Sequence, residues 1–181
     1  MDEKTIQNLR LRSDTKLRFA KVHLEELKEL EHIGGSDFDK AHQESFLYHL
    51  LGAKDAFLFE LNAHYNSKLS KEDLSLGKLR DALKAKGKSS PELAELYELE
   101  NQKDSWLFHA KEIRDHSTHI SNVPRSYYVK DQEIERVYLK NPKTDKIIER
   151  HFVDEFSDWL EKMKLLLEKL RKSAIENNRD Q

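Results

Sequence analysis

The sequence predicts an all-α protein: an up-and-down bundle of about five helices with a small β-hairpin before the last helix. Three observations support this prediction. Leucine, phenylalanine, tryptophan and isoleucine recur at three- and four-residue intervals through most of the chain, which is the helical period. Only 5 glycines and 3 prolines occur in 181 residues, which is too few for the many turns of a sandwich or barrel. The charged fraction of 36% suits helices that each keep one solvated face.

Length and charge limit the class of protein. A chain of 181 residues without a low-complexity linker is expected to form one domain over residues 1–181. The formal charge of -2 counts against tight nonspecific coating of a nucleic-acid duplex, although a small positive pocket stays open. The absence of cysteine excludes disulfides and thiolate catalysis. The N-terminus has no apolar signal core and no apolar run reaches the length of a membrane span, so we expect a cytoplasmic protein with no membrane partner.

Start and stop signals divide the first half of the chain into three helices. Residues 1–12 are polar with scattered leucines and are expected to form a mobile arm or an extra helical turn. A helix is predicted from residue 13 or 14 to residue 33, where Gly34-Gly35 ends it. The next helix, from residue 36 or 37 to about 66, is the most apolar and is expected at the centre of the bundle. A shorter helix is predicted over residues 72–85.

The second half begins with a fourth helix, after which the residue composition changes. Ser90-Pro91 is a strong start signal, and the helix is predicted to run from residue 91 to about 121, because Pro124 prevents its continuation. β-branched and aromatic residues follow, over residues 125–151. Within this insertion we expect a two-stranded hairpin, with strands at 134–140 and 146–151.

The last predicted helix spans about residues 153–175. Its apolar residues step by three and four over three heptads, so this face can pack along a helix of the same chain or of a second copy. The polar tail at 176–181 is expected to fray.

One compact set of chemistry-bearing residues lies near the end of the fourth predicted helix, in the run Arg114-Asp115-His116-Ser117-Thr118-His119. The arginine fork fits phosphate oxygens, and histidine can take or give a proton near neutral pH. On an ideal helix, Arg114 and His119 point about 140° apart. For both to touch one substrate, the helix must loosen near Ser117, the arginine must wrap around it, or a second subunit must supply one group about a twofold axis.

The pattern Arg114-Asp115-x-x-x-His119 resembles the Arg-x4–6-His motif of the HEPN family, in the variant with a polar residue after the arginine. Many HEPN domains are metal-independent ribonucleases that act as homodimers through a cleft between subunits, and several are toxins silenced by a nucleotidyltransferase partner. The resemblance implies a homodimer, RNA as substrate, an antitoxin-type protein partner and no cofactor. The chain departs from the partner-modified toxins at Ser121, where they carry tyrosine.

The resemblance also implies catalytic roles. Arg114 would hold the scissile phosphate and stabilise the charge that builds on it in the transition state. His119 would act as general base or general acid, and Asp115 would orient one of the two. Around this motif, we expect Lys111, Arg125, Tyr127 and Tyr128 to bind substrate, because cationic and aromatic side chains can hold phosphates and stack on bases. For the tyrosine pair, hairpin or core packing is the alternative.

Two further hypotheses stay open. Four residues spaced by three, four and three could ligate zinc, nickel or iron, with a further ligand from His49 or His64. These four are His109, Glu112, His116 and His119. The other hypothesis is a noncatalytic helical module that binds a nucleotide or a protein partner.

Overall fold

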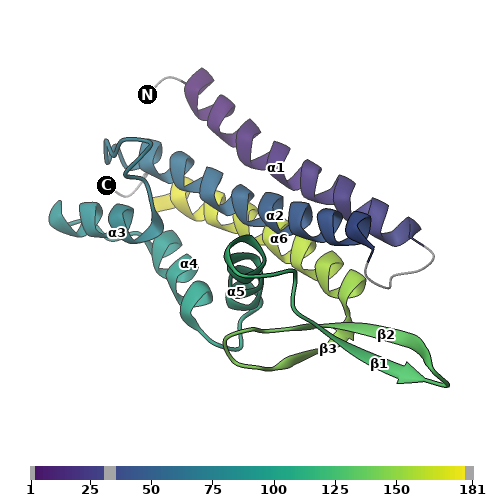
Figure 1. Cartoon of the computed structure of the whole chain (residues 1–181). Coiled ribbons are helices and arrows are strands. Elements are labelled where there is room, and N and C mark those ends of the chain that lie inside the picture. Colours follow the sequence, from purple (N-terminus) through teal and green to yellow (C-terminus); the bar gives the residue numbers. More distant parts are fainter. Residues whose placement is uncertain (1–2, 31–35, 178–181) are drawn as a thin grey trace.

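The computed structural model describes residues 3–30 and 36–177, and within them it shows six helices and one three-stranded sheet (Figure 1). The helices are α1 Glu3–Glu29, α2 Asp37–His64, α3 Leu76–Ala85, α4 Pro91–Asn101, α5 Trp106–His119 and α6 Phe152–Asn177. The strands are β1 Arg125–Lys130, β2 Glu133–Lys140 and β3 Ile147–His151, paired antiparallel in the order β1-β2-β3. The mostly helical prediction is confirmed.

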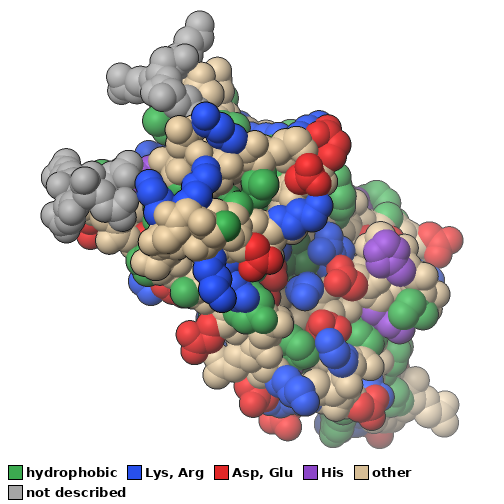
Figure 2. Space-filling view, turned by 90° about the vertical axis from the view of Figure 1, so that its left-hand side faces the viewer, with side chains coloured by type: hydrophobic (Ala, Val, Ile, Leu, Met, Phe, Trp, Pro, Cys, Tyr) green, Lys and Arg blue, Asp and Glu red, His purple; other side chains and the backbone are tan. Residues whose placement is uncertain are grey.

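The longest helices, α1, α2 and α6, lie along one another, and α3, α4 and α5 pack against α2 and α6 (Figure 1). The start of α1 and the end of α6 lie at the same end of the bundle, because these two helices run in opposite directions. Charged side chains of both signs are interspersed over the face in Figure 2. No helix in the described part of the chain is long and apolar enough to cross a bilayer.

The core is built around α2, as the sequence predicts. Seven of its large apolar side chains are buried: Phe46, Leu47, Leu50, Leu51, Phe57, Leu58 and Leu61. The apolar face of α6 is buried as well, and it packs on α1, α2 and α4 of the same chain. Its seven heptad residues are Val153, Phe156, Leu160, Met163, Leu167, Leu170 and Ala174. Burial of this continuous seam stabilises the bundle, at roughly 25 cal/mol per Å² of apolar surface removed from water.

Of the two alternatives for residues 1–12, the helical one is confirmed for residues 3–12, which belong to α1, because no glycine or proline interrupts this stretch and Ser13 lies fully buried in the middle of the helix. One prediction about the N-terminal half is corrected. The third helix begins at Leu76 and not at residue 72, since the Ser75 hydroxyl caps it by accepting a hydrogen bond from Lys78 N at 3.3 Å. The predicted stop at Gly34-Gly35 lies outside the described residues.

The predicted helix over 91–121 is two helices. The Ser105 hydroxyl caps α5 by accepting a hydrogen bond from Phe108 N at 3.1 Å, and it donates to the Leu99 carbonyl of α4. Leu93, Leu96 and Leu107 are all buried, so the apolar pattern continues across this break.

The hairpin prediction is also incomplete. Residues 125–130 form a third strand, β1, which pairs with β2 with a register shift between Tyr128 and Val129. The α6 helix continues to Asn177, so the predicted fraying at residue 176 is wrong for the first two tail residues. The rest of the tail lies outside the described residues.

A buried ion pair joins the sheet to the central helix. Arg125 Nη1, at the start of β1, lies 3.0 Å from Asp39 Oδ2 in the first turn of α2, and both side chains are almost fully buried. The other Asp39 oxygen accepts a hydrogen bond from Gln43. The Ser36 cap that begins α2 therefore lies next to the attachment point of the sheet.

We expect Arg125→Ala to destabilise the protein by about 3–5 kcal/mol, because it leaves the Asp39 carboxylate buried without a counter-charge. The free energy of unfolding, measured by urea denaturation with circular dichroism, tests this. Arg136→Ala, on the exposed part of β2, is the matched control and should change stability by no more than about 0.5 kcal/mol. Equal stability of the two variants would show that the ion pair does not hold the sheet.

Candidate functional site

The Arg114–His119 motif lies in the last turns of α5, which stays helical through His119. A loosening near Ser117, one of the three ways in which Arg114 and His119 could meet, does not occur. Instead, the hydroxyls of Ser117 and Thr118 both donate to the Arg114 carbonyl, at 2.9 Å and 2.8 Å. Arg114 and His119 therefore leave the helix on different flanks, and each lines a different pocket.

Arg114 lines a cavity of about 170 Å³ that opens between α1, α2 and α5. We call this cavity the Arg114 pocket. Its other residues are Arg12 and Lys16 of α1 and Tyr48, Gly52, Asp55, Ala56 and Phe59 of α2. Three cations from two helices thus converge on one small open site, together with the Asp55 carboxylate, whose Oδ1 lies 3.0 Å from Lys54 Nζ.

The cations of the Arg114 pocket have few partners in the protein. Lys16 Nζ lies 4.7 Å above the Tyr48 ring and 3.5 Å from His49 Nδ1, and Arg12 Cζ lies 4.9 Å from the centre of the Phe59 ring. Among the described residues, no carboxylate lies within 4.0 Å of either charged group. Both cations are held against aromatic faces, where they remain available to an anion.

Arg114 itself is only partly neutralised. Its Nε lies 2.7 Å from Asp115 Oδ1, but the angle is too poor for a hydrogen bond, and this buried N–H has no other acceptor among the described residues. The terminal guanidinium nitrogens likewise have no hydrogen-bond acceptor in the described part of the chain. The planar fork, which fits two oxygens of a phosphate, is therefore free at the pocket.

Gly52 leaves a notch beside these cations. A Cβ at this position would lie 3.4 Å from Lys16 Cδ, an ordinary van der Waals contact with a flexible side chain. Packing therefore does not require glycine here, although glycine costs roughly 1 kcal/mol relative to alanine inside a helix. The missing side chain leaves the pocket open next to Lys16.

On the other flank of α5, His119 lines a shallow pocket of about 320 Å³ with Asp115, His116, Pro142 and Lys143. We call it the His119 pocket. Asp115 is the link between the two sites, because it lines this pocket and also pairs with Arg114. Within one subunit, the guanidinium and the imidazole do not meet in one cavity.

The alternative metal site is not formed. No group of three or more His, Cys, Asp or Glu in the described ranges is arranged to hold a metal ion. The physical reason lies in the partners of the predicted ligands. His109 is buried and its Nδ1 lies 2.8 Å from Asn141 Nδ2, while Glu112 pairs with Lys143 at 3.3 Å. His49 lies in a separate aromatic cluster between α1 and α2.

The predicted substrate-binding residues are scattered. The Arg125 side chain is 4% exposed and belongs to the ion pair with Asp39, so it does not present a cation to solvent. Tyr127 and Tyr128 are 46% and 51% exposed on β1, away from both pockets of the motif. Lys111 is partly buried on α5 and lines neither pocket.

The spacing of residues around Arg114 does not reveal the cations that accompany it in the fold. One signal could have found them: residues 5–24 carry five cations against a single acid, Asp14, in a chain of net charge -2. The cations are Arg10, Arg12, Lys16, Arg18 and Lys21. Only the tertiary packing shows that Arg12 and Lys16 lie beside Arg114.

Comparison with known proteins assigns the chain to a family but indicates no activity. Residues 7–177 match the model of a family described as a family of unknown function, DUF6586, and the chain belongs to this family. No curated protein and no solved structure matches the chain.

Five histidines have a pKa below their ordinary value of 6.5 in the folded protein, with burial as the largest cause. They are His23, His49, His64, His109 and His151. Neighbouring cations lower the pKa further in some of them, as Lys146 does for His109 and Lys16 does for His49. A neutral His109 can accept the hydrogen bond from Asn141.

These directions predict that the free energy of unfolding falls as the pH is lowered from 7.5 towards 5. Below about pH 6.5 the unfolded chain binds protons that the folded histidines still exclude, so acid favours unfolding until the folded pKa values are passed. Urea denaturation at several pH values measures the slope. His109→Gln should show a shallower slope than the wild type. A stability that is constant or rises over this range would contradict the prediction.

Proposed function

We propose that this protein binds single-stranded RNA through the Arg114 pocket. The observation that carries the proposal is the convergence of Arg12, Lys16 and Arg114 on one open cavity, where the lining carboxylate, Asp55, is paired with Lys54 instead. A guanidinium fork binds phosphate oxygens in pairs, and the nearby ammonium adds a compact positive charge. A phosphodiester placed there would receive the hydrogen bonds that the protein leaves unmade.

The aromatic rings favour a nucleic acid over a simple anion. Tyr48 is largely exposed at the pocket, and Phe59 is partly exposed beside Arg12. A base can stack on such a ring for roughly 1–3 kcal/mol, and it is free to do so only in a single strand. The rings can stack on bases and the cations can bind phosphates, so the pocket suits a strand in which bases and phosphates alternate.

The charge of the whole chain limits the mode of binding. With a net charge of -2, the protein cannot coat a long duplex by charge alone. The positive charge is concentrated on residues 5–24, so a short segment of a few nucleotides is the expected ligand. Affinity should therefore fall steeply as salt is raised.

Binding of a fluorescein-labelled 12-nucleotide RNA, measured by anisotropy at low salt, tests the proposal. Arg114→Gln and Lys16→Gln should each weaken binding about tenfold or more, since each removes a charged hydrogen-bond donor. Each should also reduce the slope of log K against log salt by about 0.7. Lys84→Gln on α3 removes the same charge from a distant exposed site and should bind as the wild type does. RNA affinity that is equal in all four proteins would refute the proposal.

A second candidate function is RNA cleavage by a HEPN-like homodimer. The arrangement of Asp115 favours it, because this side chain pairs with Arg114 and also lines the His119 pocket. The helix neither loosens nor lets Arg114 wrap around it, so a second copy is what could bring the two groups together. A twofold axis near the end of α5 would place Arg114 of one copy against the imidazole of the other. Arg114 would then bind the scissile phosphate, and His119 would transfer the proton.

Mixing two inactive variants tests the shared cleft. Arg114→Gln and His119→Gln should each abolish cleavage of RNA in the presence of EDTA. An equimolar, re-equilibrated mixture should recover about a quarter of the wild-type activity, because half of the dimers are mixed and each of these has one intact cleft out of two. A mixture that stays inactive, or wild-type protein that does not cleave, would exclude this candidate. RNA binding through the Arg114 pocket would not be affected by that result.

A further inference from the structure

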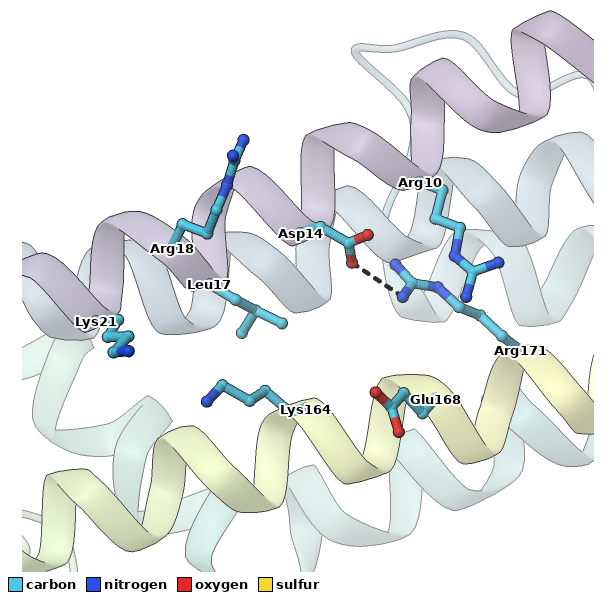
Figure 3. Close-up of a pocket in the computed structure, with 8 residues that line it drawn as sticks. All are labelled: Arg10, Asp14, Leu17, Arg18, Lys21, Lys164, Glu168 and Arg171. Carbon is cyan, nitrogen blue, oxygen red and sulfur yellow. Dashed lines mark ion pairs between the residues drawn. The ribbon is translucent and has the colours of Figure 1, made fainter.

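A second cluster of cations lies on the other side of α1, in a groove of about 280 Å³ between α1 and α6 (Figure 3). Leu17 of α1 lies at the bottom of this groove, which we call the α1–α6 groove. Five cationic side chains line it: Arg10, Arg18 and Lys21 from α1 and Lys164 and Arg171 from α6. Two carboxylates, Asp14 and Glu168, oppose them.

Both carboxylates lie in the half of the groove nearer to Arg10 and Arg171, between Arg10 and the two lysines (Figure 3). Arg171 lies in this half, and its Nη1 is 3.0 Å from Asp14 Oδ1. Glu168 has no cation within 4.0 Å among the described residues. The same guanidinium is 2.9 Å from Glu60 on α2, and its side chain is about nine-tenths buried. Arg171 therefore holds helices together and does not contribute a free charge to the groove.

The other end has a surplus of positive charge. Lys21 and Lys164 reach into the groove from opposite walls, and Figure 3 shows Lys164 directed along the groove towards Lys21. Among the described residues, Lys21 has no carboxylate within 4.0 Å, and Lys164 has only the exposed Glu161, at 3.3 Å. Arg18, on the rim, donates to Thr15 Oγ1 at 2.8 Å and likewise has no carboxylate partner in the described ranges.

Lys21 and Lys164 approach from opposite walls, and the exposed Glu161 is their only carboxylate partner among the described residues. The two ammonium groups repel, and an anion placed between them would reduce the repulsion. Arg10 lies eleven residues before Lys21 on the same helix, about 16 Å along the axis, and Asp14 lies between the two, so Arg10 does not extend this site.

We infer that the Lys21 end of the α1–α6 groove binds a phosphate group of a polyanionic ligand, held between Lys21 and Lys164 with Arg18 on the rim. The chemistry is shared by a free polyphosphate, the tail of a nucleoside triphosphate and the backbone of a nucleic acid. The inference does not rest on the proposed function, because the groove and the Arg114 pocket use different residues on opposite sides of α1. No aromatic ring lines the groove in the described part of the chain, so it should recognise phosphates and not bases.

Isothermal titration calorimetry with tripolyphosphate at low salt tests the groove. Lys21→Gln/Lys164→Gln should weaken binding at least tenfold relative to the wild type. The control Lys71→Gln/Lys84→Gln removes the same charge from exposed sites around α3 and should bind as the wild type does. Melting curves should agree closely for all three proteins, because all four lysines lie at the surface and none is in a buried ion pair.

Three outcomes would overturn the inference: no tripolyphosphate binding by the wild type, equal affinity in the groove variant and its control, or weaker tripolyphosphate binding in Arg114→Gln but not in the groove variant.

Anisotropy with the 12-nucleotide RNA then identifies the source of the phosphates. If the groove variant loses tripolyphosphate but keeps its affinity for RNA, the ligand is a free or nucleotide polyphosphate. If the groove variant loses affinity for both tripolyphosphate and RNA, the ligand of the groove is an RNA backbone. A wild-type protein that binds tripolyphosphate but not RNA would refute the proposed function without contradicting the inference about the groove.

Discussion

The central position of α2 is the constraint on which the rest of this structure depends, because neighbouring elements bury its inward face. Each inward-facing charge of such a helix needs a partner, because an unpaired charge in the interior is strongly destabilising. In this chain, each partner comes from a different element. Asp39 pairs with Arg125 of β1, Lys54 with Glu100 of α4, and Glu60 with Arg171 of α6. The apolar contacts draw the elements together, and these three pairs fix where each one sits along the helix.

The same constraint shapes the surface sites. Arg171 is tied to Glu60 and Asp14, so one end of the groove between α1 and α6 is neutral and structural, while the other end keeps its positive charge. In a similar way, α5 is held against α2, which brings Arg114 to the side of α1 that carries Arg12 and Lys16. Both cationic sites are therefore consequences of how neighbouring helices are anchored to the central one.

Sequence periodicity predicts the structural features that are determined within a single helix. It predicted the central place of α2, the buried face of α6 and the angular separation of Arg114 and His119. It failed at Ser105, because the apolar pattern runs on through Leu96 and Leu107 while a serine cap turns the chain between them. It could not find the partner of Arg125, which is 86 residues away at the start of another helix. Contacts between distant segments determine that pair and the composition of the Arg114 pocket, and local spacing carries no information about them.

The register shift between Tyr128 and Val129 has a consequence for how the protein behaves at high concentration. β1 lies at the edge of the sheet, so one row of its backbone N–H and C=O groups is open to another chain, and its tyrosines and valine are exposed. A straight edge of this kind would be a template for intermolecular strand pairing. The extra residue at this register shift is Glu135 of β2, and a bulge increases the local twist of the sheet beside the edge. Lys130 places a charge at the tip of the edge, so the bulge and the charge together disfavour intermolecular strand pairing.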